Sequence, residues 1–389
     1  MIEWNETTLS EIIEIIGGGT PKTSNPEYWN GDIPWLSVVD FNNNRKFVET
    51  TEKSITKHGL LNSSTKLLRE GDIIISTRGT VGAIAVLKRD MAFNQSCYGI
   101  RPIQKIADTD FVYYLIKGSI ESLVQISHGG VFDTITRESF QAIKIPLPPL
   151  QEQKAIAGVL SSLDEKIDLL YRQNKTLEAI AEIMFRQWFI ERAEDNWEVV
   201  ELKDIIVLQS GFSFKSKNYQ EIGKYQIVTI KAVQDGYLEL KNANRISSIP
   251  VNMPSHCNLF LGDILLSLTG NVGRCCLVDE YDLLLNQRVA KIVPEDGFRS
   301  FIYVFFRKQE TRNQLEDLAK GTAQQNLSPI ETSKMKITLP PSKPLDEFNA
   351  VVEPILDRLL LNKILIKHIV KLRDTLLPKL KSGEVRVDY

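Results

Sequence analysis

The chain has 389 residues and a formal net charge of −2, and 43% of its residues are hydrophobic while 25% are charged. That composition is typical of a globular protein with two or three well-packed domains. No apolar run reaches the roughly 18 residues that a membrane span requires, and the first residues lack the basic start and apolar stretch of a secretory signal. We therefore expect a cytoplasmic protein with no membrane segment.

The charge balance argues against a strongly basic nucleic-acid-binding domain, because a basic footprint is the usual sign of one. Residues 1–147 carry 15 Lys and Arg against 17 Asp and Glu, and residues 197–341 carry 17 against 16. Residues 148–196 carry 6 against 9, whereas residues 342–389 carry 9 against 7, so these two segments differ in the sign of their charge. Any DNA contact must therefore use local patches or a basic partner.

The first predicted domain, residues 1–147, mixes short apolar runs with glycine, proline and asparagine. The apolar runs predict strands over 73–75, 83–87 and 143–145, and a short helix over 111–117. Such a mixture is typical of an α+β domain built on a small curved sheet.

A long helix follows in residues 148–196, directly after Leu147. Its apolar positions alternate in steps of four and three residues, which is the pattern of a coiled-coil seam. At 1.5 Å per residue, the seam is roughly 50 Å long. The ten seam positions are Ile156, Leu160, Leu163, Ile167, Leu170, Asn174, Leu177, Ala181, Met184 and Trp188.

The second half of the chain repeats the first at a spacing close to 192 residues. Leu-Pro-Pro occurs at 147–149 and again at 339–341, and Asn-Gln occurs at 94–95 and again at 286–287. A period this long is a whole domain plus a connector rather than a solenoid repeat. We expect a second α+β domain over residues 197–341. Its predicted strands are 264–268, 275–278 and 335–337, and its predicted helix is 301–309.

The final segment, residues 342–389, carries a second seam with the same step pattern. If the two helices run antiparallel with aligned ends, Asn174 and Asn362 meet and fix the register. The alternative is that each seam packs only on its own domain. Pro354 should kink this helix or mark its start. The seam positions are Phe348, Val352, Ile355, Leu359, Asn362, Ile366, Ile369, Arg373, Leu376 and Leu380.

Three loops recur in both halves and combine glycine with polar side chains. They lie at 17–24 and 210–217, at 76–82 and 267–273, and at 128–134 and 320–326. Each one alone is better interpreted as a plain turn, but their joint recurrence favours a shared binding face, since such side chains reach phosphates and base edges. The candidate DNA-binding residues are Thr20, Pro21, Lys22, Arg78, Thr80, His128, Thr134, Ser213, Lys215, Lys217, Thr269, Asn271, Thr322, Gln324, Gln325 and Asn326.

No pattern predicts a catalytic or metal site. No Lys-Ser or Lys-Thr pair follows a glycine, so there is no P-loop, and the cysteines and histidines lack metal-ligand spacing. The run 25–28 (Asn-Pro-Glu-Tyr) is close to the adenine-holding motif of amino-methyltransferases but departs at its third residue, and a turn is the better interpretation. The run 164–166 (Asp-Glu-Lys) has no partner carboxylate, so we expect it to be a solvated helix flank.

The whole chain resembles the specificity subunit of type I restriction-modification systems. The second Leu-Pro-Pro departs from the family pattern, because residues 342–347 replace its Leu-Gln-Glu-Gln run. The motifs that carry the resemblance are residues 147–156 (Leu-Pro-Pro-Leu-Gln-Glu-Gln-Lys-Ala-Ile), 163–167, 19–21 (Gly-Thr-Pro), 71–73 (Gly-Asp-Ile), 79–82 (Gly-Thr-Val-Gly) and the tail 376–384.

The resemblance implies two similar α+β target-recognition domains, residues 1–147 and 197–341, each with small mixed sheets and short helices. Residues 148–196 and 342–389 would separate them as a long antiparallel two-helix coiled coil with pseudo-twofold symmetry. It also implies a non-catalytic subunit that reads a bipartite target in double-stranded DNA. Two modification subunits would use S-adenosylmethionine to methylate adenine, and restriction/translocase subunits would use ATP and Mg²⁺. This chain itself would bind no cofactor or metal.

By the same resemblance, exposed faces of the two helices dock the modification subunits. The expected docking residues are Gln153, Arg172, Arg186 and Phe189 in the first helix, and Lys363, Lys367 and Lys371 in the second. Two other hypotheses are a duplicated scaffold that binds protein or glycan rather than DNA, and a self-sufficient methyltransferase. The second predicts methyl transfer by the purified chain alone, for which no catalytic constellation is present in the sequence.

Overall fold

The structure, a computed structural model, describes residues 4–127, 134–320 and 326–387. It divides into two compact units, Met1–Leu170 with Ile366–Tyr389, and Tyr171–Leu365. Two long helices, α6 (Leu150–Arg186) and α10 (Ser342–Ser382), each contribute one part to each unit.

The first unit contains the first repeat. Its helices are α1 (Val38–Phe41), α2 (Lys57–Leu61), α3 (Thr109–Lys117), α4 (Ile120–Ser127) and α5 (Arg137–Ala142). Its strands are β1 (Asn5–Thr8), β2 (Ile13–Gly17), β3 (Trp29–Leu36), β4 (Phe47–Val48), β5 (Lys53–Ile55), β6 (Leu67–Leu68), β7 (Ile73–Ser76), β8 (Ile84–Leu87), β9 (Met91–Phe93), β10 (Cys97–Pro102) and β11 (Lys144–Leu147).

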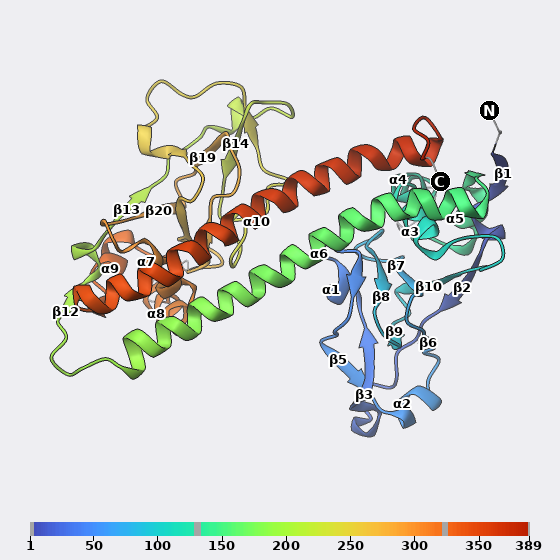
Figure 1. The fold of residues 1–389 in the computed structure, drawn as a ribbon, viewed down its shortest axis with the longest axis horizontal. Coiled ribbons are helices and arrows are strands. Elements are labelled where there is room, and N and C mark those ends of the chain that lie inside the picture. The colour runs from blue at the N-terminus through green and yellow to red at the C-terminus, as the bar shows by residue number, and fades with distance from the viewer. Residues whose placement is uncertain (1–3, 128–133, 321–325, 388–389) are drawn as a thin grey trace. The chain divides into compact units, whose positions relative to one another are not determined.

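These strands form three small sheets, in agreement with the small mixed sheets that the resemblance implies, whereas the apolar runs alone indicated one small curved sheet. The sheet orders are β1-β11, β2-β10-β7-β8-β4 and β5-β3-β9-β6 (Figure 1). Two of the pairings, β3 with β9 and β4 with β8, are parallel, so both larger sheets are mixed. The predicted strands and helix are all present. Every residue of β7 and β8 is buried, and strands that are covered on both faces have continuous apolar runs, which is why the sequence predicts these two. The additional strands β2, β3 and β10 are longer, but Glu14, Asp32 and Arg101 interrupt their apolar runs.

The second unit contains the second repeat, with the same plan. Its helices are α7 (Arg299–Arg307), α8 (Gln309–Ala319) and α9 (Pro329–Ser333). Its strands are β12 (Val199–Glu201), β13 (Ile206–Ser210), β14 (Tyr225–Val228), β15 (Arg245–Ile246), β16 (Asn258–Leu259), β17 (Ile264–Ser267), β18 (Cys275–Leu277), β19 (Leu283–Leu285), β20 (Val289–Pro294) and β21 (Lys336–Thr338). Their orders, β12-β21, β13-β20-β17-β18 and β15-β14-β19-β16, reproduce those of the first repeat apart from the edge strand β4.

The two long helices pack against each other in both units, which confirms mutual packing of the seams. Every seam position on both helices is buried or half-buried. In the first unit Ile167 and Leu170 form a cluster with Ile366. In the second unit Phe185 and Phe348 are in ring contact. Residue numbers rise along α6 as they fall along α10, so the helices are antiparallel in each unit.

The helices also contribute to the domain cores. In the first unit, Ile156 and Leu160 of α6 share a core with Phe111 of α3. In the second unit, Phe185 of α6 and Phe348 of α10 share a core with Phe301 of α7. Each repeat is therefore held to the helix pair by apolar contacts, and the long helices are more than connectors.

The start of α10 is now defined. The helix begins at Ser342, directly after Leu-Pro-Pro, and continues through Pro354 to Ser382, so Pro354 does not mark its start. Pro344 lies in the first turn, where backbone N–H groups have no partner within the helix, so that proline is well tolerated.

The expectation that Asp164 lies on a solvated flank is wrong. Its carboxylate is buried, accepts a hydrogen bond from the Tyr114 hydroxyl at 2.7 Å, and forms an ion pair with Arg373. Arg373 occupies a seam position of α10 and is itself buried, so its charge requires this partner. Burial, and then the charge of Asp164, raise the pKa of Tyr114 well above its ordinary value. The hydroxyl therefore stays protonated and donates.

Candidate nucleic-acid interface

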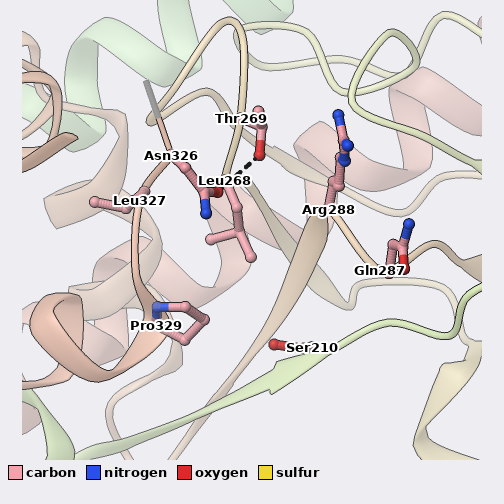
Figure 2. A pocket seen from close by; sticks show the side chains of 8 residues that line it. All are labelled: Ser210, Leu268, Thr269, Gln287, Arg288, Asn326, Leu327 and Pro329. Atoms are coloured by element: carbon pink, nitrogen blue, oxygen red, sulfur yellow. Dashed lines mark hydrogen bonds between the residues drawn. The ribbon is translucent and has the colours of Figure 1, made fainter. Parts of the chain in front are cut away.

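The recurring loops of the second repeat converge on one surface pocket. They meet where β13 ends, where β17 ends and where β20 begins (Figure 2). The pocket has a volume of about 500 Å³. It is lined by Ser210, Leu268, Thr269, Gln287, Arg288, Asn326, Leu327 and Pro329.

Backbone hydrogen bonds hold these loops together. The N–H of Leu327 donates to the carbonyl of Leu268 at 2.7 Å, and the N–H of Leu268 donates to the carbonyl of Arg288 at 3.1 Å. The N–H of Phe212 donates to the carbonyl of Leu285 at 2.9 Å. Three loops that are far apart in the sequence thus form one surface.

The first repeat makes the same three hydrogen bonds at the corresponding positions. The N–H of Ile135 donates to Thr77 at 3.1 Å, that of Thr77 donates to Ser96 at 2.8 Å, and that of Gly19 donates to Phe93 at 2.9 Å. Each residue precedes its counterpart by 191 to 193 positions. The recurrence seen in the sequence therefore corresponds to a shared backbone arrangement, within which the polar side chains differ.

The hairpin between β7 and β8, and its counterpart between β17 and β18, depend on glycine. Gly79 and Gly82 have φ of +74° and +90°, and Gly270 and Gly273 have φ of +74° and +77°. Side chains other than glycine rarely adopt this left-handed conformation. The four glycines thus shape the hairpin tips that present Arg78, Thr80 and Asn271.

Most of the predicted DNA-binding residues that the structure describes are accessible. Pro21 is buried and cannot reach a ligand, which corrects that assignment. His128, Thr322, Gln324 and Gln325 lie outside the described residues. Thr20, Thr134 and Thr269 are half-buried. The exposed candidates are Lys22, Arg78, Thr80, Ser213, Lys215, Lys217, Asn271 and Asn326.

Sequence reasoning missed three residues that take part in these surfaces. Gln287 and Arg288 line the pocket of the second repeat, and Gln95 accepts a hydrogen bond from the hydroxyl of Thr20 in the first. The recurring Asn-Gln pair was the signal that could have identified the two glutamines. Because it lies in no glycine-rich loop, only the fold places it beside the loops.

The lining of the second-repeat pocket suits an anionic, hydrogen-bonding ligand. Its eight residues include one cation, Arg288, and no acidic side chain. The hydroxyl of Thr269 donates to Oδ1 of Asn326 at 2.9 Å, which orients that amide (Figure 2). A duplex presents both phosphate charge and base-edge donors and acceptors to such a surface.

Three of the expected docking residues are engaged within the protein: Gln153 and Phe189 are buried, and half-buried Lys363 binds a backbone carbonyl. Gln153 is 1% exposed and binds the N–H of Asp108 and the carbonyl of Ile106 at 2.9 and 3.0 Å. Phe189 packs in the aromatic core beside Phe301. Lys363 donates to the carbonyl of Gly236. Each side chain thus fixes a repeat to a helix, a role that the helix pattern alone could not reveal.

The other expected docking residues are accessible. Arg172, Arg186 and Lys371 are exposed, and Lys367 is half-buried. Arg186 forms an ion pair with Glu191 at 2.9 Å, between two exposed side chains, which costs little to break.

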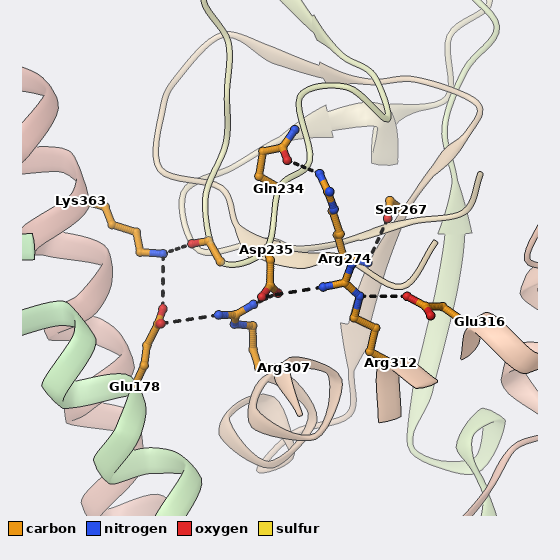
Figure 3. Close-up of polar contacts among 10 residues, drawn as sticks. Glu178, Gln234, Asp235, Ser267, Arg274, Arg307, Arg312, Glu316 and Lys363 are labelled. Carbon is orange, nitrogen blue, oxygen red and sulfur yellow. Dashed lines mark hydrogen bonds and ion pairs between the residues drawn. The ribbon is translucent and has the colours of Figure 1, made fainter. Parts of the chain in front are cut away.

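Polar contacts connect the helix pair of the second unit to its β17–β18 hairpin (Figure 3). Lys363 of α10 binds Gly236, and Arg307 of α7 pairs with both Glu178 of α6 and Asp235. Gln234, which directly precedes Asp235, accepts a hydrogen bond from Arg274, the last residue of the hairpin before β18. The surface loops of this repeat are therefore braced against the long helices.

The sequence motifs set aside as non-catalytic have structural roles. Asn25 caps a short helical turn over Pro26–Tyr28, with its Oδ1 accepting the N–H of Glu27 at 3.1 Å. Burial raises the pKa of the Cys97 and Cys275 thiols to about 12, so both stay protonated. Within the described ranges, no three His, Cys, Asp or Glu side chains are grouped so as to hold a metal ion. None of the described helices has the length and apolar character needed to cross a membrane.

Taken together, two similar α+β repeats with matching loop surfaces and a shared antiparallel helix pair define a duplicated recognition protein. A sequence profile described as the type I restriction modification DNA specificity domain matches residues 1–179 and 194–366. The chain therefore belongs to the family of type I restriction-modification specificity subunits, which are non-catalytic.

Relatives cover the full length of the chain. The specificity subunit of type I restriction enzyme MjaIX from Methanocaldococcus jannaschii is 27% identical over 99% of this chain and 94% of its own length. That of EcoKI from Escherichia coli is 25% identical over 90% and 81%. A crystal structure of the type I S subunit from M. genitalium matches with a TM-score of 0.60 at 16% identity, over 98% of this chain and 96% of that one, and so has the same fold.

Proposed function

We propose that each repeat reads one half of a bipartite target in double-stranded DNA, and that the long helices set the spacing between the halves. The main support is the pair of loop surfaces, which share three backbone hydrogen bonds but differ in their polar side chains. A common backbone keeps the mode of docking, while different side chains select different bases.

The family and the charge support the partners that we propose. Two modification subunits dock on the long helices and methylate adenine with S-adenosylmethionine, and restriction/translocase subunits use ATP and Mg²⁺. A net charge of −2 leaves most of the phosphate neutralisation to those partners. Arg172, Arg186, Lys367 and Lys371 are the docking residues that remain in this proposal. The complex would act in the cytoplasm, where host DNA is present.

Exchange of the first repeat tests the assignment of half-sites. Residues 1–147 are replaced by those of another family member, with a junction before α6 that leaves both helices intact. Methylated adenines are then mapped in the host genome. We expect one half-sequence to change, while the other half and the spacer are kept. An unaltered methylation motif would favour a scaffold that binds something other than DNA.

Lengthening both helices tests the spacing role. Residues 167–173 are duplicated in α6 and residues 366–372 in α10, which adds one heptad to each helix and keeps every seam layer paired, Asn174 with Asn362 included. The added length is roughly 10 Å, about that of three base pairs of 3.4 Å. We expect a longer recognised spacer with both half-sequences unchanged. A duplication in one helix alone is the control, since it misaligns the seam and should abolish assembly. An unchanged spacer in the doubly lengthened protein would refute the spacing role.

A further inference from the structure

The two loop surfaces carry an arginine at different places on the same backbone. The second repeat has Arg288 where the first has Ser96, and both carbonyls accept the same backbone hydrogen bond. In the hairpin the relation is reversed, because the first repeat has Arg78 where the second has Thr269. The two repeats therefore share the backbone at both positions and differ in which of the two positions carries an arginine.

Arg288 is also unlike the other arginines of its repeat. The protein itself binds the side chains of the other five, Arg245, Arg274, Arg299, Arg307 and Arg312. Among the described residues, no side chain or carbonyl binds the guanidinium of Arg288, which is exposed at the pocket. A guanidinium left free beside a surface without acidic groups is available to a ligand.

The backbone that carries Arg288 is well fixed. The residue directly precedes β20, its carbonyl accepts the N–H of Leu268 at 3.1 Å, and a turn ties the N–H of Val289 to Asn286 at 2.9 Å. Figure 2 shows its side chain extending near Thr269 and Gln287, away from the strand. A planar guanidinium on a rigid support is suited to the paired acceptors O6 and N7 of guanine, which lysine cannot match in the same way.

We propose that Arg288 reads a guanine in the half-site bound by the second repeat. The proposal rests on the proposed function, because it presupposes that this repeat contacts DNA. Ser96 has no guanidinium, so the first repeat makes no equivalent guanine contact from this position. Arg288 thus determines specificity at one base pair and makes the two half-sites chemically different.

The test replaces Arg288 in the full chain in its own host and maps methylated adenines. The variants are Arg288→Ser, which installs the residue of the first repeat, and Arg288→Lys, which keeps the charge. Lys241→Ser is the matched control, because it removes an exposed cation of the same repeat away from the pocket. The exchange of residues 1–147 identifies which half-site belongs to the second repeat.

We expect both Arg288 variants to relax a single guanine position in that half-site, with the preference for guanine falling roughly tenfold to a hundredfold. The control should leave the motif unchanged. Competition binding with the assembled complex gives a second readout. A duplex with 7-deazaguanine at that position should bind the natural protein more weakly than a duplex with guanine does. The Arg288→Ser protein should bind the two duplexes equally.

Other outcomes would overturn the proposal. If Arg288→Ser lowers methylation at all sites with an unchanged motif and Arg288→Lys restores it, Arg288 contacts phosphate rather than a base. Relaxation in the other half-site would contradict the assignment to the second repeat. If no methylation motif depends on the natural chain, the proposed function itself is wrong. If a motif is present but does not change when Arg288 is replaced, only the role of Arg288 is wrong.

Discussion

Asn174 and Asn362 form a buried polar pair within the apolar seam of the second unit. Nδ2 of Asn362 donates to Oδ1 of Asn174 at 2.9 Å, as expected from their ranks in the two seams. Asn362 is fully buried, and its Oδ1 has no hydrogen-bond partner among the described residues. Such a pair costs stability relative to leucine but is satisfied in one register, so it specifies how the helices align.

Replacing one or both asparagines tests this role. Asn174→Leu leaves the amide of Asn362 buried without its partner, and we expect the free energy of unfolding to fall by about 1–3 kcal/mol. The double variant Asn174→Leu/Asn362→Leu should regain that loss, because an apolar layer then replaces the pair. Denaturant unfolding of the two single variants and the double variant measures the coupling. Strictly additive losses would show that the two residues do not act as a pair.

Lys117, at the end of α3, is a half-buried cation whose charge the fold disfavours. Burial, and then the positive charge of Arg373, lower its pKa from 10.5 to about 8. Its Nζ donates a hydrogen bond of 3.4 Å to the Tyr113 hydroxyl, which is a neutral group. Below pH 8 the lysine is charged in both the folded and unfolded states, so its desolvation cost is then fully present. Above about pH 10.5 it is neutral in both, and the cost disappears.

We therefore expect Lys117→Met to stabilise the protein at pH 7 by about 1–2 kcal/mol, which allows for partial solvation of the amine. The gain should shrink as the pH rises from about 8 to 10.5. The difference in unfolding free energy between variant and natural protein, measured across that range, isolates this group from others that titrate. A gain that does not change with pH would point to packing rather than charge.

At the scale of the element, α10 carries a proline in its interior. Pro354 is exposed between the buried Val352 and Leu356, and it lacks the N–H that would bond one turn back. The helix continues there because the residues on either side are anchored in the core of the second unit. Tertiary packing thus overrides a strong local preference against helix.

Pro354→Ala should raise the free energy of unfolding by about 1–3 kcal/mol, because it restores a backbone hydrogen bond and a favourable helix residue. The matched control is Pro344→Ala in the first turn, where no such bond exists to restore, and little change is expected there. Chemical denaturation of both variants provides the comparison. Equal gains at the two positions would contradict the argument.

At the scale of the whole molecule, ion pairs fasten each repeat to the long helices, and in both units a cation of the repeat pairs with a carboxylate of α6. In the first unit the loop before β4 carries the cations, and Arg45 pairs with Asp168 of α6. In the second unit the corresponding loop carries the anion, and Asp235 pairs with Arg307 while Lys363 of α10 binds the neighbouring carbonyl. The loops share a residue in the left-handed conformation, Asn44 in one and Gly236 in the other. The first loop thus contacts α6 directly through Arg45, whereas the second reaches α6 through Arg307, which pairs with both Asp235 and Glu178.

Asp235→Lys tests this contact by placing a cation against Arg307, next to the carbonyl that Lys363 binds. We expect it to destabilise the second unit by about 1–3 kcal/mol at low salt, since the guanidinium of Arg307 is largely buried and would lose one of its carboxylates. The loss should shrink as salt is added. Asp317→Lys is the control, because Asp317 pairs with Lys320 and both side chains are exposed. Identical losses in both variants, measured by denaturant unfolding, would sink the idea of a charge-matched contact.

The amino-acid sequence by itself determined the features that depend on local pattern or on repetition. The two seams, the duplication, the apolar strands such as β7 and β17, and the meeting of Asn174 with Asn362 all follow from spacing along the chain. They could be predicted because helix and strand periods are set by local backbone geometry.

Only the tertiary structure decided which loops share a surface and which side chains are accessible. Gln153 and Phe189 lie on a helix whose pattern is compatible with exposure, yet contacts with Asp108 and Phe301, distant in the sequence, bury them. Arg288 lies beside the loops because β13, β17 and β20 are neighbours in one sheet. Burial and proximity of this kind arise from long-range packing, which no local period encodes.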